Sequence, residues 1–390
     1  MHNKLKKEKE QKMTKVVVGL SGGVDSAVAA FLLKKQGYLV EAVFMRNWDS
    51  NLNFDIQGNP TLNDICPQEL DYKDALKVSE QLGIKLHRVD FIEEYWQKVF
   101  MSFIKAFENN LTPNPDILCN NEIKFRAFIE YVTTKLAPRY IAMGHYANII
   151  YETFSEQKLF PQLACAVDQN KDQTYFLSQL ATKQLQNILF PLGNLTKQEV
   201  RQIALENNLI NATKKDSTGI CFIGERNFFQ FLSNYLPAQK GDIKTLDGTF
   251  LAHHKGVMYY TIGQRKNLGL GDFSSQKPWF VVGKHLQTNT LYVEQGNTHP
   301  YLYSDKALIS DIVWRGKKTN LHLQAKMRYR QPNQDVILTW IDQNTLEIYY
   351  PQTIKAVTPG QICAFYNNNI CCGAGVIKEV YFQGTKRLYT

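Results

Sequence analysis

The sequence lacks the long apolar runs that membrane and secreted proteins carry. No stretch of the 390 residues is apolar for long enough to span a bilayer. The first fifteen residues are polar and Lys-rich, without the apolar centre of a secretory signal, and Glu8 and Glu10 are atypical of a transit peptide. We therefore expect a cytoplasmic globular protein with no membrane partner, preceded by a disordered basic extension over residues 1–13.

Cysteines are also few, and their spacing does not suit structural metal sites. The chain has seven, an odd number, and none forms a CxxC pair. This pattern indicates neither a zinc ribbon nor a secreted disulfide framework, so we expect no protein-bound metal. We expect Cys66, Cys165 and Cys363 to be packing residues, and the adjacent Cys371 and Cys372 to face opposite sides of a strand.

Positive charge is concentrated in one part of the chain. The net charge is +9, and residues 217–390 hold 19 Lys and Arg against 11 Asp and Glu. Residues 1–216 hold 26 against 25, a balance of +1, although their first fifteen residues alone carry +4. An excess of this kind on one module is typical of a protein that binds a polyanion such as a nucleic acid.

The first half of the chain alternates strand-like and helix-like segments. Strands are expected at Val16–Leu20, Leu39–Met45, Lys85–Asp90 and Tyr140–Gly144, and helices at about Ser26–Gln36, Leu70–Leu82, Glu93–Asn109 and Glu122–Leu136. Residues 171–208 also look helical. This alternation predicts an α/β domain with a doubly wound parallel sheet, which binds its ligands at the carboxyl ends of the strands.

After about residue 216, β-branched and aromatic runs separated by Gly, Asn and Asp turns replace this rhythm. The expected strands are Val257–Ile262, Trp279–Val282, Thr290–Val293, Leu321–Tyr329, Asp335–Trp340 and Leu346–Tyr350. They predict one or two small β-barrels. We accordingly expect a catalytic domain over residues 14–216, a central β domain over 217–300 and a C-terminal β-barrel domain over 301–390.

The strongest local signal is a glycine turn between the first strand and the first helix. Apolar residues run into Ser21-Gly-Gly-Val-Asp-Ser26, and a helical pattern follows. The free N–H groups of such a turn and the positive end of the helix bind phosphate. We expect positive φ angles at Gly22 and Gly23, and Asp25 either to cap the helix or to hold Mg²⁺. No Lys follows the glycines, which excludes a kinase-type loop.

Two cysteines have surroundings that favour reactivity. Cys119 follows the Pro-rich loop Thr112–Asp116, so we expect it at the entrance of a helix that begins near Asn120, where the pKa of a thiol falls. Asp116 precedes it by three residues and is a candidate general acid or base. Cys221 lies close to Lys214 and Lys215, which would also favour the thiolate.

Several motifs together resemble one family over essentially the whole chain, the tRNA-uridine 2-sulfurtransferases, also called tRNA-specific 2-thiouridylases. These motifs are Gly19–Ser26, Asn114-Pro-Asp116 with Cys119, Met143-Gly-His-Tyr-Ala147, Lys171-Asp-Gln-Thr-Tyr-Phe176, Asp216–Glu225, Arg328-Tyr-Arg-Gln331 and Pro359-Gly-Gln361. The Lys-rich segment before Met13 is a departure from this pattern.

The resemblance implies a role for each matching position. ATP would be bound by Gly19, Leu20, Ser21, Gly22, Gly23, Val24, Asp25, Ser26, Met45 and Gly144. The target base would meet Asn114, Pro115 and Asp116, and the tRNA would contact His145, Lys171, Asp172, Gln173, Arg328, Tyr329 and Gln361. Cys119 would be the nucleophile and Cys221 the persulfide carrier.

The implied activity is the 2-thiolation of the wobble uridine of tRNA. ATP, with Mg²⁺, would adenylate the uracil C2 oxygen, and sulfur from a Cys221 persulfide would then displace AMP. Cys119 would either release sulfide from that persulfide or resolve it as a Cys119–Cys221 disulfide. A cysteine desulfurase or a persulfide relay protein would supply the sulfur. Anticodon-loop uridines are unpaired and therefore cost least to flip into a pocket.

Three alternatives remain open at this point. A different pyrophosphate-loop enzyme, such as a lysidine synthetase, would not need the two cysteines. An iron–sulfur cluster held by Asp116, Cys119 and Cys221 would replace the persulfide route. A basic RNA-binding module with a decayed nucleotide site would show no ATP chemistry, although Ser21, Asp25 and Ser26 are intact.

Overall fold

The computed structural model describes residues 14–50, 52–53, 66–153, 159–216, 228–237, 239–271, 277–316, 318 and 321–388. Cys221 and its neighbours lie outside these residues. The chain divides into two compact units. The first contains the chain up to Val99, Asp116–Phe231 and Asn369–Cys371, and the second contains Phe100–Pro115, Leu232–Asn368 and the chain from Cys372 onward.

The first unit is built on a five-stranded parallel sheet with the order β3-β2-β1-β4-β7. Its strands are β1 (Lys15–Gly19), β2 (Leu39–Arg46), β3 (Lys85–Asp90), β4 (Tyr140–Ala142) and β7 (Ile188–Leu189). Val16, Val17 and Val18 of the central strand β1 are all fully buried, so both faces of the sheet are covered. This confirms the doubly wound parallel sheet.

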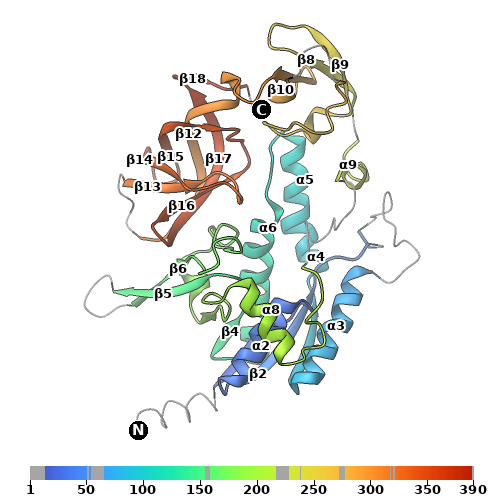
Figure 1. Cartoon of the computed structure of the whole chain (residues 1–390), viewed down its shortest axis with the longest axis vertical. Coiled ribbons are helices and arrows are strands. Elements are labelled where there is room, and N and C mark those ends of the chain that lie inside the picture. Colours follow the sequence, from blue (N-terminus) through green and yellow to red (C-terminus); the bar gives the residue numbers. More distant parts are fainter. Residues whose placement is uncertain are drawn as a thin grey trace. The chain divides into compact units, whose positions relative to one another are not determined.

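Helices on one side of the sheet share a hydrophobic core with β1 and β2, and Figure 1 shows α2, α3 and α8 beside these strands. The helices of the unit are α2 (Val24–Lys35), α3 (Pro67–Leu82), α4 (Ile92–Tyr95), the π-helix η1 (Trp96–Phe100), α6 (Pro115–Leu118), the π-helix η2 (Cys119–Ala127), α7 (Phe128–Leu136), the 3-10 helix η3 (Thr182–Leu185), α8 (Lys197–Glu206) and α9 (Phe228–Leu232). Every helix predicted before residue 140 is present, with shifted ends.

The prediction of a helix throughout residues 171–208 was wrong. Only α8 is a regular α-helix there, and turns, η3 and β7 occupy the rest of the segment. Part of the segment instead forms isolated turns, in which the Phe176 N–H donates to the Gln173 carbonyl and the Leu180 N–H to the Leu177 carbonyl, each at 3.0 Å. These bonds span three residues, whereas those of an α-helix span four.

A hairpin that the sequence analysis missed follows β4. It consists of β5 (Asn148–Thr153) and β6 (Leu159–Ala164), which pair in antiparallel register. Ala164 and Leu163 pair with Ile370 and Cys371, the two residues that begin β17 (Ile370–Phe382) and are grouped with the first unit.

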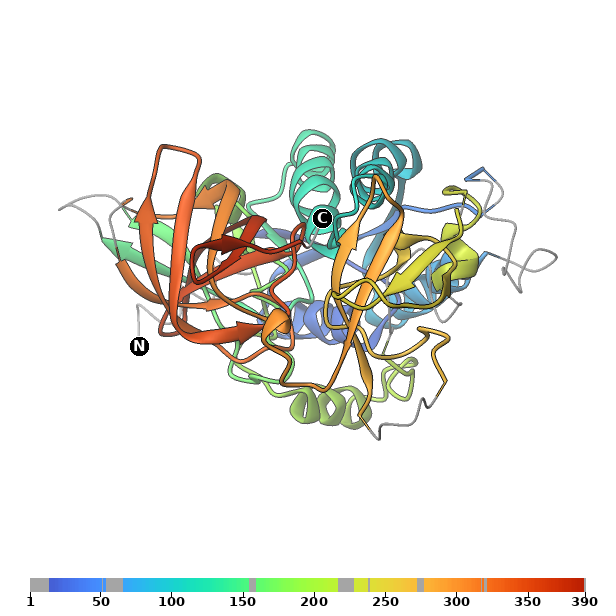
Figure 2. The same ribbon diagram turned by 90° about the horizontal axis from the view of Figure 1, so that it is seen from above.

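The second unit is mainly β-structure and contains a closed six-stranded barrel. The barrel strands follow the order β12-β15-β14-β13-β16-β17, and β17 pairs with β12 to close the ring. Figure 2 looks onto these strands, which are coloured orange to red. They are β12 (Tyr303–Trp314), β13 (Leu321–Lys326), β14 (Gln334–Trp340), β15 (Leu346–Lys355), β16 (Ile362–Asn367) and β17; the short β18 (Thr385–Lys386) pairs with β17. The predicted C-terminal barrel is therefore confirmed.

A four-stranded sheet with the order β10-β11-β8-β9 precedes the barrel. Its strands are β8 (Gly241–Lys244), β9 (Phe250–His254), β10 (Trp279–His285) and β11 (Thr290–Gln295), and the same unit holds α5 (Met101–Glu108), η4 (Val257–Tyr259) and η5 (Pro300–Leu302). Buried residues of this sheet and of the barrel form one hydrophobic cluster. No helix among the described residues is long and apolar enough to cross a membrane.

The predicted strand Val257–Ile262 was wrong. Gly256 has a φ of +146°, and the Tyr259 N–H donates to the Gly256 carbonyl at 3.1 Å, which turns the segment into η4. The Tyr259 hydroxyl also donates to the Leu236 carbonyl at 2.6 Å. The apolar and aromatic side chains are buried here through a tight turn rather than through strand pairing.

Candidate active site

The glycine turn lies at the carboxyl end of β1, where a parallel sheet binds its ligands. The Ser21 N–H donates to Ser26 Oγ at 3.1 Å, and the Ser26 hydroxyl donates to the Gly23 carbonyl at the same distance. Gly22 has a φ of +77°, and a Cβ there would lie 2.3 Å from the Asp71 carbonyl oxygen of α3. Gly22 therefore requires glycine for both its conformation and its packing.

Gly23 differs from the prediction, because its φ is −84° and it is the N-cap residue of α2. The helix consequently begins at Val24, and Asp25 lies in its first turn instead of capping it. A carboxylate in the first turn is stabilised by the helix dipole. The turn thus has one left-handed glycine instead of two.

Asp25 binds two groups from elsewhere in the sequence. Its Oδ1 accepts a hydrogen bond from the Tyr146 hydroxyl at 2.9 Å and forms an ion pair with Lys197 Nζ at 2.7 Å. Burial, and next the Asp25 charge, raise the pKa of Tyr146, so its phenol stays protonated. Lys197 is the first residue of α8, and its side chain is only 14% exposed.

Lys197 also contacts Asp216, which is the centre of an ionic cluster. Asp216 Oδ1 lies 2.8 Å from Lys197 Nζ and 2.6 Å from Arg201 Nη2, and Oδ2 lies 2.9 Å from Lys171 Nζ. Burial alone would raise the pKa of Asp216, but the bonds from Lys197 and Lys171 outweigh it and hold the pKa well below its usual range. Three cations thus face two carboxylates beside the glycine turn.

Cys119 begins the π-helix η2, which continues α6 and runs into α7. Contrary to the prediction, the helix starts at Pro115, because proline is favoured at the first position of a helix. Cys119 therefore lies one turn inside the helix, and its side chain is 4% exposed. Asp116 lies in the first turn, and burial raises the pKa of its carboxyl group against the charge of Lys124. π-Helical turns are frequent at functional sites.

Asn120, the next residue of η2, fixes the protonation of His145. Asn120 Nδ2 donates to the Phe176 carbonyl at 3.2 Å, so its Oδ1 can only accept the bond to His145 Nε2, also at 3.2 Å. Burial lowers the pKa of His145 well below its usual value, which keeps the ring neutral with the proton on Nε2. His145 Nδ1 is buried and has no protein partner among the described residues.

The segment Met143–Tyr146 links the glycine turn to the helix of Cys119. A Cβ on Gly144 would lie 3.0 Å from the backbone of Ser26, so only glycine allows this contact. Tyr146 then binds Asp25, while His145 binds Asn120. Met45 and Met143 both pack beside Gly19. The structure therefore brings together the residues predicted to bind ATP and connects them directly to the neighbour of Cys119.

The motif Lys171-Asp172-Gln173 has three different environments. Lys171 pairs with Asp216, as described above. Asp172 is buried and accepts the Ala166 N–H at 2.9 Å and the Thr174 hydroxyl at 2.6 Å. Gln173 Oε1 accepts the Tyr146 N–H at 3.0 Å. Gln173 thus holds the backbone of Tyr146 and Asp172 that of Ala166. Lys171, whose side chain is 41% exposed, is the member of the motif that faces solvent.

Asn114 and Pro115, the predicted base contacts, are grouped with the second unit, as are Arg328, Tyr329 and Gln361. Arg328 Nη2 donates to the Ile262 carbonyl at 3.1 Å and to Thr358 Oγ1 at 2.8 Å. Gln361 Nε2 donates to the Thr112 carbonyl at 2.7 Å. The structure therefore gives both side chains internal partners.

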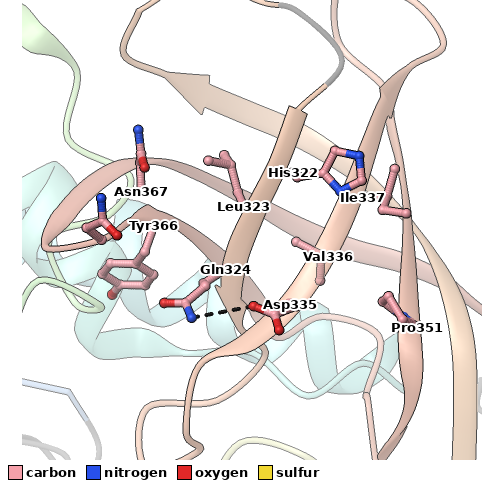
Figure 3. Close-up of a pocket in the computed structure, with 10 residues that line it drawn as sticks. His322, Leu323, Gln324, Asp335, Val336, Ile337, Pro351, Tyr366 and Asn367 are labelled. Carbon is pink, nitrogen blue, oxygen red and sulfur yellow. Dashed lines mark hydrogen bonds between the residues drawn. The ribbon is translucent and has the colours of Figure 1, made fainter.

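A shallow groove of about 390 Å³ lies on the barrel, and Figure 3 shows Gln324 and Asp335 facing each other in it. Its lining residues are His322, Leu323, Gln324, Asp335, Val336, Ile337, Pro351, Tyr366, Asn367 and Asn368. Of the predicted site residues that the structure describes, none lines this groove. The described ranges also contain no group of three His, Cys, Asp or Glu side chains that could hold a metal ion.

The sequence analysis did not identify Lys197, Arg201 or Tyr146 as site residues. A signal was available for α8, because Thr196 and Glu199 form a capping box, and the Glu199 N–H donates to Thr196 Oγ1 at 3.2 Å. Lys197 and Arg201 are four positions apart and therefore share one face of that helix.

The parallel sheet and the Ser21–Ser26 turn at the end of its first strand define a nucleotide-binding α/β protein of the pyrophosphate-loop class. Residues 14–225 match the family model described as the tRNA methyl transferase HUP domain. Residues 229–295 match the tRNA methyl transferase PRC-barrel domain, and residues 304–377 match the aminomethyltransferase beta-barrel domain.

Curated relatives match almost the whole chain. The protein named tRNA-specific 2-thiouridylase MnmA of Onion yellows phytoplasma is 95% identical over 97% of this chain and 100% of its own length. Proteins of the same name from Phytoplasma australiense and Acholeplasma laidlawii are 78% and 63% identical, over 97% and 96% of this chain and 100% and 99% of theirs. The chain belongs to the tRNA-specific 2-thiouridylase family and is an enzyme.

Proposed function

We propose that this enzyme uses ATP to convert the wobble uridine of tRNA to 2-thiouridine, with AMP and diphosphate as the other products. The observation that carries the proposal is the direct connection, through Met143–Tyr146, between the Ser21–Ser26 turn and the helix that contains Cys119. Nucleotide activation and thiol chemistry would then share one site. We assign these steps to a catalytic domain of residues 14–216, followed by β domains over 217–300 and 301–390.

In the activation step, the uracil C2 oxygen attacks the α-phosphorus of ATP and diphosphate leaves, while the N3 proton is lost to a base. The Ser21–Ser26 turn, Met45 and Gly144 would bind the nucleotide. Lys197, Arg201 and Lys171 supply three positive charges next to the turn, and such cations stabilise the charge that develops on a leaving diphosphate. Asp116, with its raised carboxyl pKa, is our candidate for the base.

Mg²⁺ would enter with ATP, because it binds through one or two carboxylates and the substrate phosphates. Asp25 and Asp216 fit this role, since both lie within 2.8 Å of Lys197 Nζ and so face a common point. A magnesium ion there would neutralise charge on the phosphates. Lys197 would then move from the carboxylates to the nucleotide.

In the sulfur step, the terminal sulfur of a Cys221 persulfide attacks C2 of the adenylated base and AMP leaves. The Cys119 thiolate then attacks the inner sulfur, which leaves the sulfur on the base and a Cys119–Cys221 disulfide that a reductant must reopen. A cysteine desulfurase or a persulfide relay protein would load Cys221. Cys119 would take this role from its place in η2 beside Asn120.

The tRNA would contact the chain mainly through its basic second half. Besides the charge excess, the second unit places Lys318 over the half-buried ring of Trp340 at 4.8 Å. Exposed cations and aromatic rings bind phosphates and bases respectively. Lys171, Arg328 and Tyr329 remain our candidates for direct contacts.

The test is nucleoside mass spectrometry on unmodified wobble-uridine tRNA, incubated with the enzyme, Mg-ATP, a reductant and a cysteine-desulfurase sulfur source. Cys221→Ser and Cys119→Ser run beside the parent enzyme, and Cys165→Ser is the matched control. We expect 2-thiouridine only with ATP and with both reactive cysteines. Retention of activity in both Ser variants would contradict the proposal.

Two further readouts separate the alternatives. Iron in anaerobically purified enzyme, together with loss of activity on its removal, would replace the persulfide route by a cluster on Asp116, Cys119 and Cys221. A parallel reaction with S-adenosylmethionine in place of ATP tests the activity named in the family models. A methylated nucleoside from that reaction would contradict thiolation.

A further inference from the structure

The loop that precedes the base-contacting motif begins with a tightly closed helix end. The Leu111 N–H donates to the Ala106 carbonyl and the Asn110 N–H to the Phe107 carbonyl, each at 2.9 Å. Asn110 has a φ of +62° and is 1% exposed. These bonds are a Schellman motif at the end of α5, with Asn110 in the left-handed position that glycine usually takes.

A buried lysine binds the first residue of this loop. Lys284 of β10 is 1% exposed, and its Nζ donates to the Asn110 carbonyl at 2.7 Å. A cation at a helix C-terminus complements the helix dipole. Burial nevertheless lowers the pKa of Lys284 to about 7. Burying this ammonium group therefore destabilises the fold, whereas burying a methionine of similar length would not.

A second side chain holds the loop two residues later. Gln361 Nε2 donates to the Thr112 carbonyl at 2.7 Å, and the Thr112 N–H donates to the Pro359 carbonyl at 3.0 Å. Thr112 Oγ1 also lies 3.5 Å from Thr261 Oγ1. The backbone of residues 110–112 is therefore held from β10 on one side and from the segment before β16 on the other.

We propose that Lys284 and Gln361 are positioning residues: they fix the backbone of residues 110–112 and thereby the base-contacting motif that follows in the chain. Pro113 is the sole residue between Thr112 and Asn114, and Asp116 is two positions further on. Proline has a fixed φ, so a displacement of Thr112 is passed on with little absorption. This inference rests on the proposed function, and it gives Gln361 a role through Thr112.

The test compares Lys284→Met and Gln361→Met in the full-length enzyme. Each variant keeps the approximate length of the side chain and removes the donor. Lys355→Met is the matched control, because Lys355 Nζ also donates to an asparagine carbonyl, that of Asn297 at 2.8 Å, but far along the chain from this loop. Hydrogen exchange of peptides that cover residues 107–118 is followed by mass spectrometry, together with steady-state thiolation and ATP binding.

We expect exchange at residues 110–112 to rise by at least about tenfold in both variants, because the loop loses a side chain that holds one of its carbonyls and therefore opens more often. kcat should fall by about 10 to 100-fold, because a misplacement of about 1 Å costs that much, while the KM for tRNA and the Kd for ATP stay within about threefold. The control should resemble the parent enzyme. A general structural role would instead raise exchange throughout the chain.

Two results would overturn the inference: unchanged exchange in the loop, or faster exchange with an unchanged kcat. Should Lys284→Met fail to fold, Gln361→Met decides alone, since Gln361 is only partly buried. An inactive parent enzyme would refute the proposed function, and the exchange experiment would still show whether the two side chains hold the loop.

Discussion

Two polar clusters of the first unit differ in charge, although the segment Met143–Tyr146 reaches both. Around Asp216 the side chains are ionic, with Lys197, Arg201 and Lys171 within 2.9 Å of its carboxylate. Around Asn120 the hydrogen-bonded side chains are neutral, and burial, followed by the charge of Lys124, holds His145 uncharged. Two adjacent residues thus contact clusters of different charge: Tyr146 contacts the ionic cluster through Asp25, and His145 contacts the neutral cluster through Asn120.

The difference agrees with what each cluster would bind. A polyphosphate needs mobile cations that can exchange a carboxylate partner for a phosphate, and the ionic cluster is partly exposed. A uracil is neutral and needs fixed donors and acceptors in a dry site, where a stray charge would be costly. Each prediction below changes one side of this comparison.

The largest effect is expected for Lys197→Met, which removes the cation shared by Asp25 and Asp216. Loss of one preorganised group that stabilises transition-state charge costs about 10² to 10³ in kcat. We therefore expect tRNA-dependent diphosphate release to fall by that factor. Release is measured with a coupled phosphate assay, and Lys77→Met, an exposed lysine on α3, is the control. An unchanged rate would show that the ionic cluster is structural.

His145→Gln tests the neutral cluster through stability. Because burial lowers the pKa of His145 well below 6.5, the unfolded chain binds a proton that the folded chain does not. The contribution of neutral His145 is therefore present above about pH 6.5 and is lost as the pH falls below it, by up to about 1.4 kcal/mol per unit. Urea unfolding between about pH 5 and pH 7 should show a shallower loss in the variant.

The control for this measurement is His322→Gln on the exposed face of β13, which should keep the slope of the parent chain. Equal slopes in the parent and in His145→Gln would mean that His145 titrates normally. The cluster around Asn120 could then no longer be called neutral.

The sequence predicted the glycine turn because every signal for it is local. The β-branched run, Gly22 and Ser26 lie within eleven residues of one another and determine the strand, the turn and the helix start. Lys197 could not be predicted in this way, since its partner Asp25 lies 172 positions away. The protonation of His145 likewise depends on the Asn120 amide, whose orientation is set by a carbonyl in a third segment.

The errors have the same origin. Residues 171–208 look helical by composition, but bonds such as that from the Phe176 N–H to the Gln173 carbonyl close isolated turns there. The prediction placed Pro115 in a loop before the helix, although proline suits a first helical position. Helix propensity describes each residue alone, whereas the local structure at these positions depends on the partner that each backbone group has in the folded chain.

Tyr146→Phe sharpens the comparison at the residue where the clusters meet. The variant loses the bond to Asp25 and keeps the ring, which is buried in the core of the unit. A hydrogen bond to a charged group contributes about 1.5 to 3 kcal/mol at most, and Lys197 still satisfies Asp25. We expect the KM for ATP to rise by about three to tenfold, measured by AMP formation. Tyr140→Phe is the control, and an unchanged KM would separate Tyr146 from the nucleotide.

The smallest effect is expected for Lys214→Met, which removes ion pairs outside both clusters. Lys214 Nζ lies 2.8 Å from Asp71 and 2.7 Å from Asp74 on α3. Burial would lower the pKa of Lys214, but these bonds raise it. The side chains are partly exposed, so water screens the pairs, and the free energy of unfolding should fall by less than about 1 kcal/mol. Urea unfolding measures this loss, and the rate of thiolation should stay within about twofold of the parent rate. A loss of activity as large as that of Lys197→Met would mean that the number of cations, and not their position beside the glycine turn, determines catalysis.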